Sequence, residues 1–496
     1  MTGEITRRSL LQAAGVGAGL AALPSASWAQ QAGPGVVDAD TLWSWNEKVA
    51  SFGCRLTGSP AQAKYVDWLA DKLERTGLKV HRDRLTFTRW APKRWSLTIG
   101  GKPVDLAFYF PYSGVTPPAG VTAPLQYLGP SPVDSAGFAA AAGKIAVVEV
   151  ATPPVPVFGV FPELGRYKPD MASPDPLVHA PCINDIALAP LLQVAAQTGV
   201  LGVVCIRTGI SDELAKDQYS PFTTGYQDCP AVWVGPTAGQ EVRDQAIAGA
   251  TATLVMDADI TKGAATDTVW GILPGTDPKE AVVVNTHSDG PNVAEENGGL
   301  GLLALAREYA AVPHSKRRRS LIFLATTGHF QLPQFAVGQG QSASRWIADH
   351  PDLIDGSKLK TVAALTLEHL GCREWLDDQT SQSYGPTGRK DVAYCFTTTS
   401  KMKDLYLGSC VGTKNDRTIA AQPGFQFGEG HDFTAKGIPG VALIPAPTYL
   451  VAAPENGGLE RLDRRYMHGQ VRTFSKVIRR LDATATSQLG TPAPSA

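Results

Sequence analysis

The sequence predicts an α/β fold, because strand-like apolar runs alternate with helical patterns and several of these runs end at ionisable side chains. Residues 281–285 form the apolar, β-branched run of a strand that is covered on both faces, and residues 300–306 have the dense apolar spacing of a buried helix. Two later apolar runs, residues 320–327 and 361–367, have the same strand character. Open α/β sheets bind ligands beyond the carboxyl ends of their strands, so we expect the functional site there.

Length and composition indicate a globular chain with more than one core. The chain has 496 residues, of which 43% are hydrophobic and 18% are charged, so we expect two domains or one domain with a large insert. A formal net charge of −1 favours neither nucleic acid nor an anionic membrane as a partner. None of the seven cysteines forms a CxxC pair, which disfavours a cysteine-ligated zinc, and Cys182 with Cys229 is a plausible disulfide.

The first 29 residues have the pattern of an export signal. Arg7 and Arg8 precede a short apolar segment that is rich in alanine and glycine, and Ser27-Trp28-Ala29 forms a small-x-small cleavage site. The stretch 6–11, TRRSLL, resembles the twin-arginine signal that carries folded proteins across the bacterial inner membrane. We therefore expect a periplasmic or secreted protein that begins near Gln30, with no contact with a membrane beyond its export.

The remaining chain reads as a main domain with an insert. Residues 63–77 predict an amphipathic helix that ends at glycine, and residues 81–90 predict a strand. Between Pro117 and Ala265 the composition becomes rich in glycine, proline and alanine, with short apolar runs, which predicts a smaller β-rich domain. The expected order is a signal peptide, the main domain in two parts, the insert and a flexible tail: 1–29, 36–116 with 266–485, 117–265 and 486–496.

The polar stretch after residues 281–285 has the residue types of a metal site. His287 would bind a metal through one ring nitrogen. Asp289 would hold that ring by a hydrogen bond, or support the site without binding the metal itself. Glu295 or Glu296 could reach the same ion or bridge two ions. A plainer alternative is a helix cap, in which the two glutamates only complement the helix dipole.

Later segments supply matching partners at comparable positions. His329 follows the second apolar run, and Glu368 with His369 follows the third. Glu429 and His431 precede a further apolar run. Each residue alone has an ordinary explanation, but their recurrence at the ends of strands is typical of an active site in an α/β sheet.

With these residues the chain resembles the M28 family of zinc aminopeptidases and carboxypeptidases, and residues 117–265 are similar to the protease-associated domain that some members insert. The sequence His287-Ser288-Asp289 matches the family's His-x-Asp motif. The resemblance implies a mixed, mainly parallel sheet between helices, and two zinc ions bridged by a carboxylate. It makes His287 a zinc ligand, Asp289 its supporting acid, Glu295 the bridging ligand and Glu368 the ligand after the third strand.

The chain also departs from the family pattern at the second metal. The family has two glutamates, a general base and a ligand, where this chain has His329 and Phe330, and phenylalanine cannot bind zinc. The family's last histidine ligand falls on Gly430, with His431 displaced by one residue. We expect one zinc ion held by His287 with two carboxylates, or two ions if His329 fills the vacancy instead of acting as the base.

These residues predict an exported, metal-dependent hydrolase that cleaves a peptide or other amide bond. Its substrate would be a peptide or a small amide or ester. The alternative is a catalytically altered or inactive relative, either an ester or amide hydrolase of other specificity or a binding protein. A serine hydrolase is disfavoured, because the chain has no Gly-x-Ser-x-Gly motif.

Overall fold

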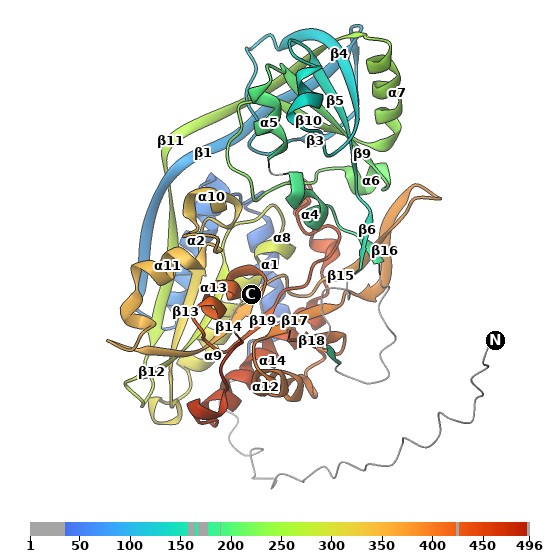
Figure 1. Ribbon diagram of the computed structural model, residues 1–496. Helices are drawn as coiled ribbons and strands as arrows, with labels where there is room; N and C mark the ends of the chain where they lie inside the picture. Colours follow the sequence, from blue (N-terminus) through green and yellow to red (C-terminus); the bar gives the residue numbers. More distant parts are fainter. Residues whose placement is uncertain (1–34, 157–163, 167–176, 189, 423–425, 494–496) are drawn as a thin grey trace, which may run out of the picture.

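The computed structural model describes residues 35–156, 164–166, 177–188, 190–422 and 426–493. The chain forms a lower and an upper lobe, which share one 15-stranded mixed sheet (Figure 1). Its strand order is β3-β10-β9-β5-β4-β11-β13-β12-β14-β19-β17-β18-β7, with β1 beside β11 and β2 beside β1. The predicted α/β class, with a mixed sheet and helices on its faces, is confirmed.

The lower lobe is built around four neighbouring parallel strands, β13, β12, β14 and β19. Its strands are β12 (Glu280–His287), β13 (Ser320–Thr326), β14 (Lys360–Leu367), β19 (Gly440–Leu443), β17 (Ala393–Thr397), β18 (Thr418–Ala421) and β7 (Leu164–Arg166), with the hairpin β15 (Arg373–Asp378) and β16 (Ser383–Lys390). Its helices are α1 (Ala39–Ala50), α2 (Pro60–Glu74), α8 (Val293–Glu296), α9 (Gly298–Ala310), α10 (Leu332–Phe335), α11 (Ala343–Asp349), α12 (Ser400–Cys410), α13 (His431–Ala435) and α14 (Arg464–Asp482).

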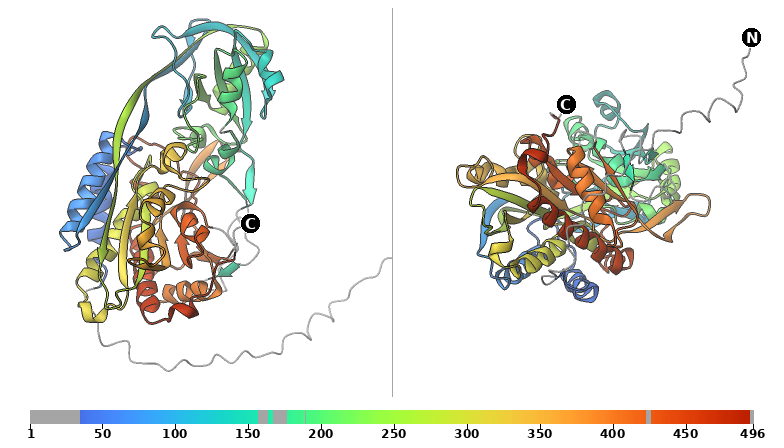
Figure 2. Two further views of the ribbon diagram at one scale, coloured as in Figure 1. Left: turned by 60° about the vertical axis from the view of Figure 1, so that its left-hand side comes forward. Right: turned by 90° about the horizontal axis from the view of Figure 1, so that it is seen from below.

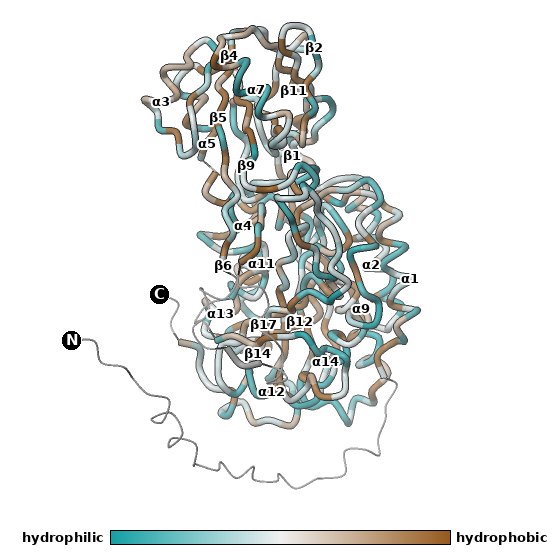
Figure 3. The backbone as a smooth tube through the Cα atoms, turned by 90° about the vertical axis from the view of Figure 1, so that its right-hand side faces the viewer, coloured by the Kyte–Doolittle hydropathy of each residue, from teal (hydrophilic) through white to brown (hydrophobic). Residues whose placement is uncertain are grey.

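Helices cover both faces of the lower sheet (Figure 2). On β12, Val282 and Val284 pack into the core formed with α1, α2, α9, α12 and α14, whereas Val283 points into a smaller core with α11 and α13. Successive side chains of a strand point to opposite faces, so a strand between two helical layers must be apolar throughout. Hydrophobic colour in Figure 3 accordingly runs along the central strands, and hydrophilic colour lies on the outer helices.

Two long antiparallel strands, β1 (Val80–Ile99) and β11 (Thr251–Leu273), join the lobes (Figure 1). The upper lobe also contains β2 (Lys102–Pro103), β3 (Leu106–Tyr109), β4 (Val121–Pro130), β5 (Ile145–Ala151), β9 (Gly202–Thr208), β10 (Ala231–Val234), α3 (Ser135–Ala139), α4 (Pro181–Asn184), α5 (Leu191–Gln197), α6 (Asp212–Ala215) and α7 (Pro236–Ile247), and the pair β6 (Pro154–Pro156) and β8 (Leu177–His179) extends from it. The strand predicted over 81–90 is longer than expected, because β11 pairs with it as far as Ile99. β11 crosses the boundary predicted at 265, and β3, before Pro117, pairs with β10 of the upper lobe.

Two expectations from the sequence are corrected by the packing. All seven cysteines are free, so the expected bond between Cys182 and Cys229 is absent. The tail predicted from residue 486 is anchored at its start: Leu489 is fully buried, and the Thr399 hydroxyl donates to its carbonyl oxygen at 2.6 Å. The predicted signal peptide lies outside the described residues. Within the part of the chain that the structure describes, no helix combines the length and apolar character of a membrane span.

Candidate metal centre

His287 is the last residue of β12 and is completely buried. Its Nδ1–H donates to the carbonyl oxygen of Asp289 at 2.9 Å, which leaves the lone pair on Nε2. Nε2 is buried and has no hydrogen-bond partner. Burial lowers the pKa of His287 well below its usual value, as do the neighbouring rings of His329 and His369. The ring is therefore neutral, in the tautomer that a metal ligand requires.

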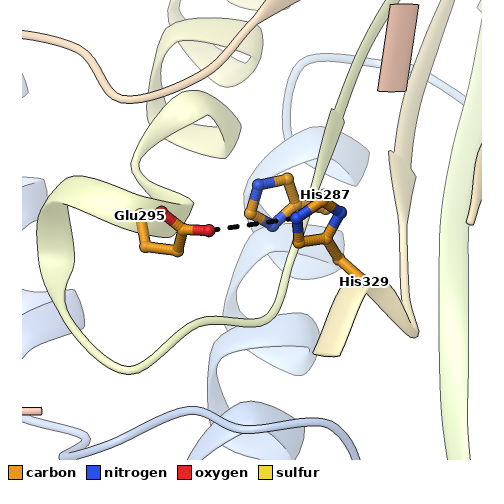
Figure 4. Close-up of side chains that lie close together, drawn as sticks. All are labelled: His287, Glu295 and His329. Carbon is orange, nitrogen blue, oxygen red and sulfur yellow. Dashed lines mark ion pairs between the residues drawn. The ribbon is translucent and has the colours of Figure 1, made fainter. Parts of the chain in front are cut away.

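Glu295 approaches this ring from helix α8. The side chain of Asn292 caps that helix, accepting from the backbone N–H of Ala294 at 2.8 Å and of Glu295 at 3.2 Å. The start of helix α9 packs directly against β14 at Gly298. A Cβ at this position would lie 2.0 Å from the Leu367 carbonyl oxygen, so the contact leaves no room for a side chain. This packing turns the Glu295 carboxylate toward the end of the sheet (Figure 4).

Glu368 and His369 follow β14 at the same edge of the sheet. His369 has a φ of 52°, which is uncommon for a residue with a side chain, and its Nδ1–H donates to the Pro445 carbonyl oxygen at 2.6 Å. Its Nε2 lies 3.1 Å from Glu295 Oε2. Burial alone would lower the pKa of His369, but the charge and contact of Glu295, together with the charge of Glu368, raise it. Burial raises the pKa of Glu368 to about 7, against the opposing charges of His369 and His329.

These side chains form two overlapping groups whose possible ligand atoms all lie within 4.8 Å of one another: His287, Glu295 and His329 in one, and His287, Glu368 and His369 in the other. Zinc bonds to nitrogen and oxygen at about 2.0–2.2 Å, so its ligands lie within about 4 Å of each other. Among the buried atoms here that have no hydrogen-bond partner, His287 Nε2, Glu295 Oε2 and His369 Nε2 belong to these groups, whereas Asp289 Oδ1 and Glu296 Oε2 do not. The residues present therefore fit one zinc ion.

His329 begins the short turn η4 (His329–Gln331) after β13, and its ring is stacked on His287 with 4.2 Å between ring centroids. Its Nδ1–H donates to Glu429 Oε1 at 2.9 Å, and its Nε2 lies 3.9 Å from Glu295 Oε1 (Figure 4). Burial alone would lower the pKa of His329. The hydrogen bond and charge of Glu429, together with the charges of Glu295 and Glu368, outweigh burial and raise this pKa to about 9.

The Asp289 carboxylate fastens the loop that carries His329 and does not touch the His287 ring through its oxygens. Asp289 Oδ2 accepts from the backbone N–H of Gly328 at 3.2 Å and of Phe330 at 3.1 Å, and from the Thr57 hydroxyl. The contact with His287 is made by its carbonyl oxygen instead. Asp289 therefore supports two segments of the site at once.

Two sequence candidates are not brought to the cluster. Glu296 forms a buried ion pair with Arg55, and burial raises its pKa to about 8 although the charge of Arg55 opposes the rise. The His431 side chain is 37% exposed and pairs with Asp432 at 3.1 Å. A third candidate, Glu429, contacts the cluster through His329 and belongs to neither group of possible ligands.

The upper lobe covers the cluster with aromatic side chains. Phe222 stacks on His329 with 5.6 Å between ring centroids and lies 4.9 Å from Phe330, which is fully buried. The Tyr112 hydroxyl donates to the carbonyl oxygen of Phe330. Sequence reasoning missed these contacts, because Phe222 and Tyr112 lie in segments without ionisable motifs. A surface cavity of about 650 Å³ lies elsewhere, at α1 and the start of α14, and is lined by Trp43, Arg464 and their neighbours.

The chain is similar in fold to solved structures of aminopeptidases and other peptidases. An aminopeptidase from Aneurinibacillus sp. strain AM-1 is 15% identical, with a TM-score of 0.57, and the match covers 93% of this chain and 96% of that one. A zinc aminopeptidase from Bacillus subtilis is also 15% identical, with a TM-score of 0.59 over 91% of this chain and 97% of that one. A peptidase M28 precursor from Shewanella amazonensis SB2B is 13% identical, with a TM-score of 0.60, and the match covers 90% of this chain and 98% of that one.

No protein-family model and no curated protein sequence matches the chain. At these identities the structural matches show the fold alone. The chain thus has the fold of the M28-type zinc aminopeptidases over most of its length, with a buried cluster of histidines and glutamates at the carboxyl edge of its parallel strands.

Proposed function

We propose that this protein is an exported, zinc-dependent hydrolase that cleaves a peptide bond or another amide bond. The observation that carries the proposal is the pair of buried histidine and glutamate groups that share His287, in which His287 Nε2, Glu295 Oε2 and His369 Nε2 have no hydrogen-bond partner. A buried polar atom without a partner is costly, so a cluster of such atoms is the mark of a bound cation.

Zinc would be held by His287 with Glu368 and His369, and Glu295 adjoins this group through its contact with His369. When bound, zinc would polarise the substrate carbonyl and acidify water. Without a bound cation the pKa of His329 is about 9, and the charge of a cation beside the ring would lower it. The neutral imidazole would then take the proton of the attacking water at Nε2 and return it to the leaving nitrogen. Asp289 would keep His329 in place through the loop at residues 328–330. The closely packed cover of Phe222 and Phe330 would exclude bulk water from the reacting atoms.

We propose one zinc ion per chain. The pairing of charges supports this number: Glu296 is paired with Arg55, and Glu429 with His329. Glu295 and Glu368 contact only histidines, chiefly His369, and with that ring neutral they would balance one divalent cation. Phe330 stands where a ligand for a second ion would be needed, and its ring packs against Phe222 instead.

Export and the role of the upper lobe are part of the same proposal. The twin arginines and the Ser27-Trp28-Ala29 site support delivery to the periplasm. The upper lobe would act as a protease-associated type of insert that shapes access to the site, because Phe222 is its contact with His329. Such a role requires no catalytic group from the lobe itself.

A second candidate function is a binding protein with the hydrolase fold but without catalysis, which the loss of a ligand at Phe330 favours. The two candidates are separated by assaying purified protein against aminoacyl, acyl-peptide and ester substrates before and after removal of metal with a chelator. Hydrolysis that is lost with the metal and restored by zinc supports the hydrolase. Bound metal without hydrolysis of any of these substrates would instead support the binding protein.

A further inference from the structure

The carboxylate of Glu429 is held by three donors from the protein itself. Its Oε1 accepts from His329 Nδ1–H at 2.9 Å and from the Ser342 hydroxyl at 2.8 Å, and its Oε2 accepts from the Ala343 backbone N–H at 2.6 Å. The side chain is fully buried. Both oxygens are thus occupied, unlike Glu295 Oε2, which has no hydrogen-bond partner. A metal could gain Glu429 as a ligand only at the expense of these bonds.

The backbone of the same turn, η6 (Gly428–Gly430), holds the metal-binding side of the cluster. The backbone N–H of Glu429 donates to Glu368 Oε1 at 2.9 Å. Gly428 has a φ of +59°, and a Cβ at this position would lie 2.3 Å from Glu368 Oε2, so the close approach requires glycine. One turn therefore fixes two elements of the site, the His329 ring and the Glu368 carboxylate.

We propose that Glu429 is a positioning residue for His329 and not a metal ligand. Its hydrogen bond fixes a proton of His329 on Nδ1 and directs Nε2 toward Glu295, where Nε2 would accept a proton from the attacking water. In the hydrolysis the bond from water oxygen to carbonyl carbon forms and the carbon–nitrogen bond breaks. The proton passes from water to Nε2 and then to the leaving nitrogen. This inference rests on the proposed hydrolase function.

The test is Glu429→Gln, because glutamine keeps the size of the side chain and replaces one acceptor oxygen with a donor. We expect kcat to fall by about 10–100-fold, the usual cost of losing a carboxylate behind a functional histidine, with KM and metal content within about twofold of wild type. Ser342→Ala removes only one of the donors to Glu429 and should give a smaller loss in the same direction. This milder variant keeps the test decisive if Glu429→Gln does not fold.

Glu308→Gln is the matched control. Glu308 is also a buried carboxylate that accepts from a serine hydroxyl, that of Ser475 at 2.9 Å, and it pairs with Arg479 on α14, away from the cluster. A general cost of losing a buried carboxylate would appear in this variant as well. We expect its kcat, KM and metal content to match those of wild type.

Two results would overturn the inference. Loss of bound metal from Glu429→Gln would make Glu429 a ligand, and an unchanged kcat would leave it without a role. Nitrogen NMR of histidine-labelled protein separates failure of the positioning role from failure of the proposed hydrolase function. Wild type should show a protonated, hydrogen-bonded Nδ1 for His329, a signal that is assigned by its loss in His329→Gln. Glu429→Gln should shift that signal. A chain that hydrolyses nothing yet shows this shift would refute the hydrolase proposal alone, whereas a signal unchanged in Glu429→Gln would contradict the positioning role.

Discussion

Both lobes bury charged side chains at parallel strands, and the way these charges are satisfied differs. In the upper lobe, Arg207 on β9 makes two hydrogen bonds to Asp185, at 2.6 and 3.2 Å, and its guanidinium lies 3.9 Å from the centre of the Trp233 ring. In the lower lobe, His287 Nε2 and Glu295 Oε2 are buried without a hydrogen-bond partner, and the contacts of Glu295 are with the rings of His369 and His329. A buried charge that is paired needs no other partner. Buried ligand atoms that lie close together without hydrogen-bond partners indicate instead a place where a cation binds.

The largest effect is expected for His287→Ala. This change removes the ligand whose Nε2 has no other use, and with it several kcal/mol of transition-state stabilisation, so hydrolysis should fall by about 10³-fold or more. Turnover of the best substrate of wild type is the measurement, and circular dichroism confirms that the variant folds. Turnover near the wild-type rate would remove the metal site from its proposed place.

Asp185→Ala tests the other half of the comparison. Removing one partner of a buried pair leaves Arg207 uncompensated and should cost about 3–5 kcal/mol of folding stability. Urea unfolding followed by tryptophan fluorescence measures this loss, because Trp233 lies against Arg207. The metal content of the folded variant should remain that of wild type. A fall in metal content would show that the buried pair of the upper lobe affects metal binding in the lower lobe.

Glu296→Gln tests, within the lower lobe, the distinction between a buried carboxylate that is paired and one that binds metal. Glu296 adjoins Glu295 in the sequence but is paired with Arg55, so it should behave like the upper-lobe pair and not like a ligand. We expect a loss of about 1–3 kcal/mol in stability, the cost of weakening a buried hydrogen bond to a charged group. Metal content by elemental analysis should not change. If the variant loses its metal, the distinction between paired and unpaired carboxylates fails.

The smallest effect is expected for Phe222→Ala. Phe222 is the upper-lobe side chain that stacks on His329, and such ring contacts contribute about 0.5–1.5 kcal/mol. KM should therefore rise by up to about tenfold with metal content unchanged, and steady-state kinetics on two substrates of different size would measure the change. An identical KM for both substrates in variant and wild type would argue against a role of the upper lobe in access.

The sequence predicted the central strands of the lower lobe, β12, β13 and β14, because residues 281–285, 320–327 and 361–367 are apolar on both faces and end at ionisable side chains. It could not predict the length of β1, which depends on pairing with β11 across more than 150 residues of intervening chain. The prediction that His287, Glu295 and Glu368 lie at the same edge of the sheet followed from topology alone. The direction of each side chain did not: His431 and Glu429 are close in the chain, and only the fold turns the first outward and the second toward His329.

The most direct test of the central claim is the metal content of the purified, mature protein. Elemental analysis combined with native mass spectrometry should find one zinc ion per chain in wild type and none in His287→Ala, with Glu308→Gln matching wild type. Each outcome follows from the unpartnered atoms of His287, Glu295 and His369. Wild-type protein that takes up no metal from a zinc-containing buffer, or His287→Ala that retains a full equivalent, would contradict the account.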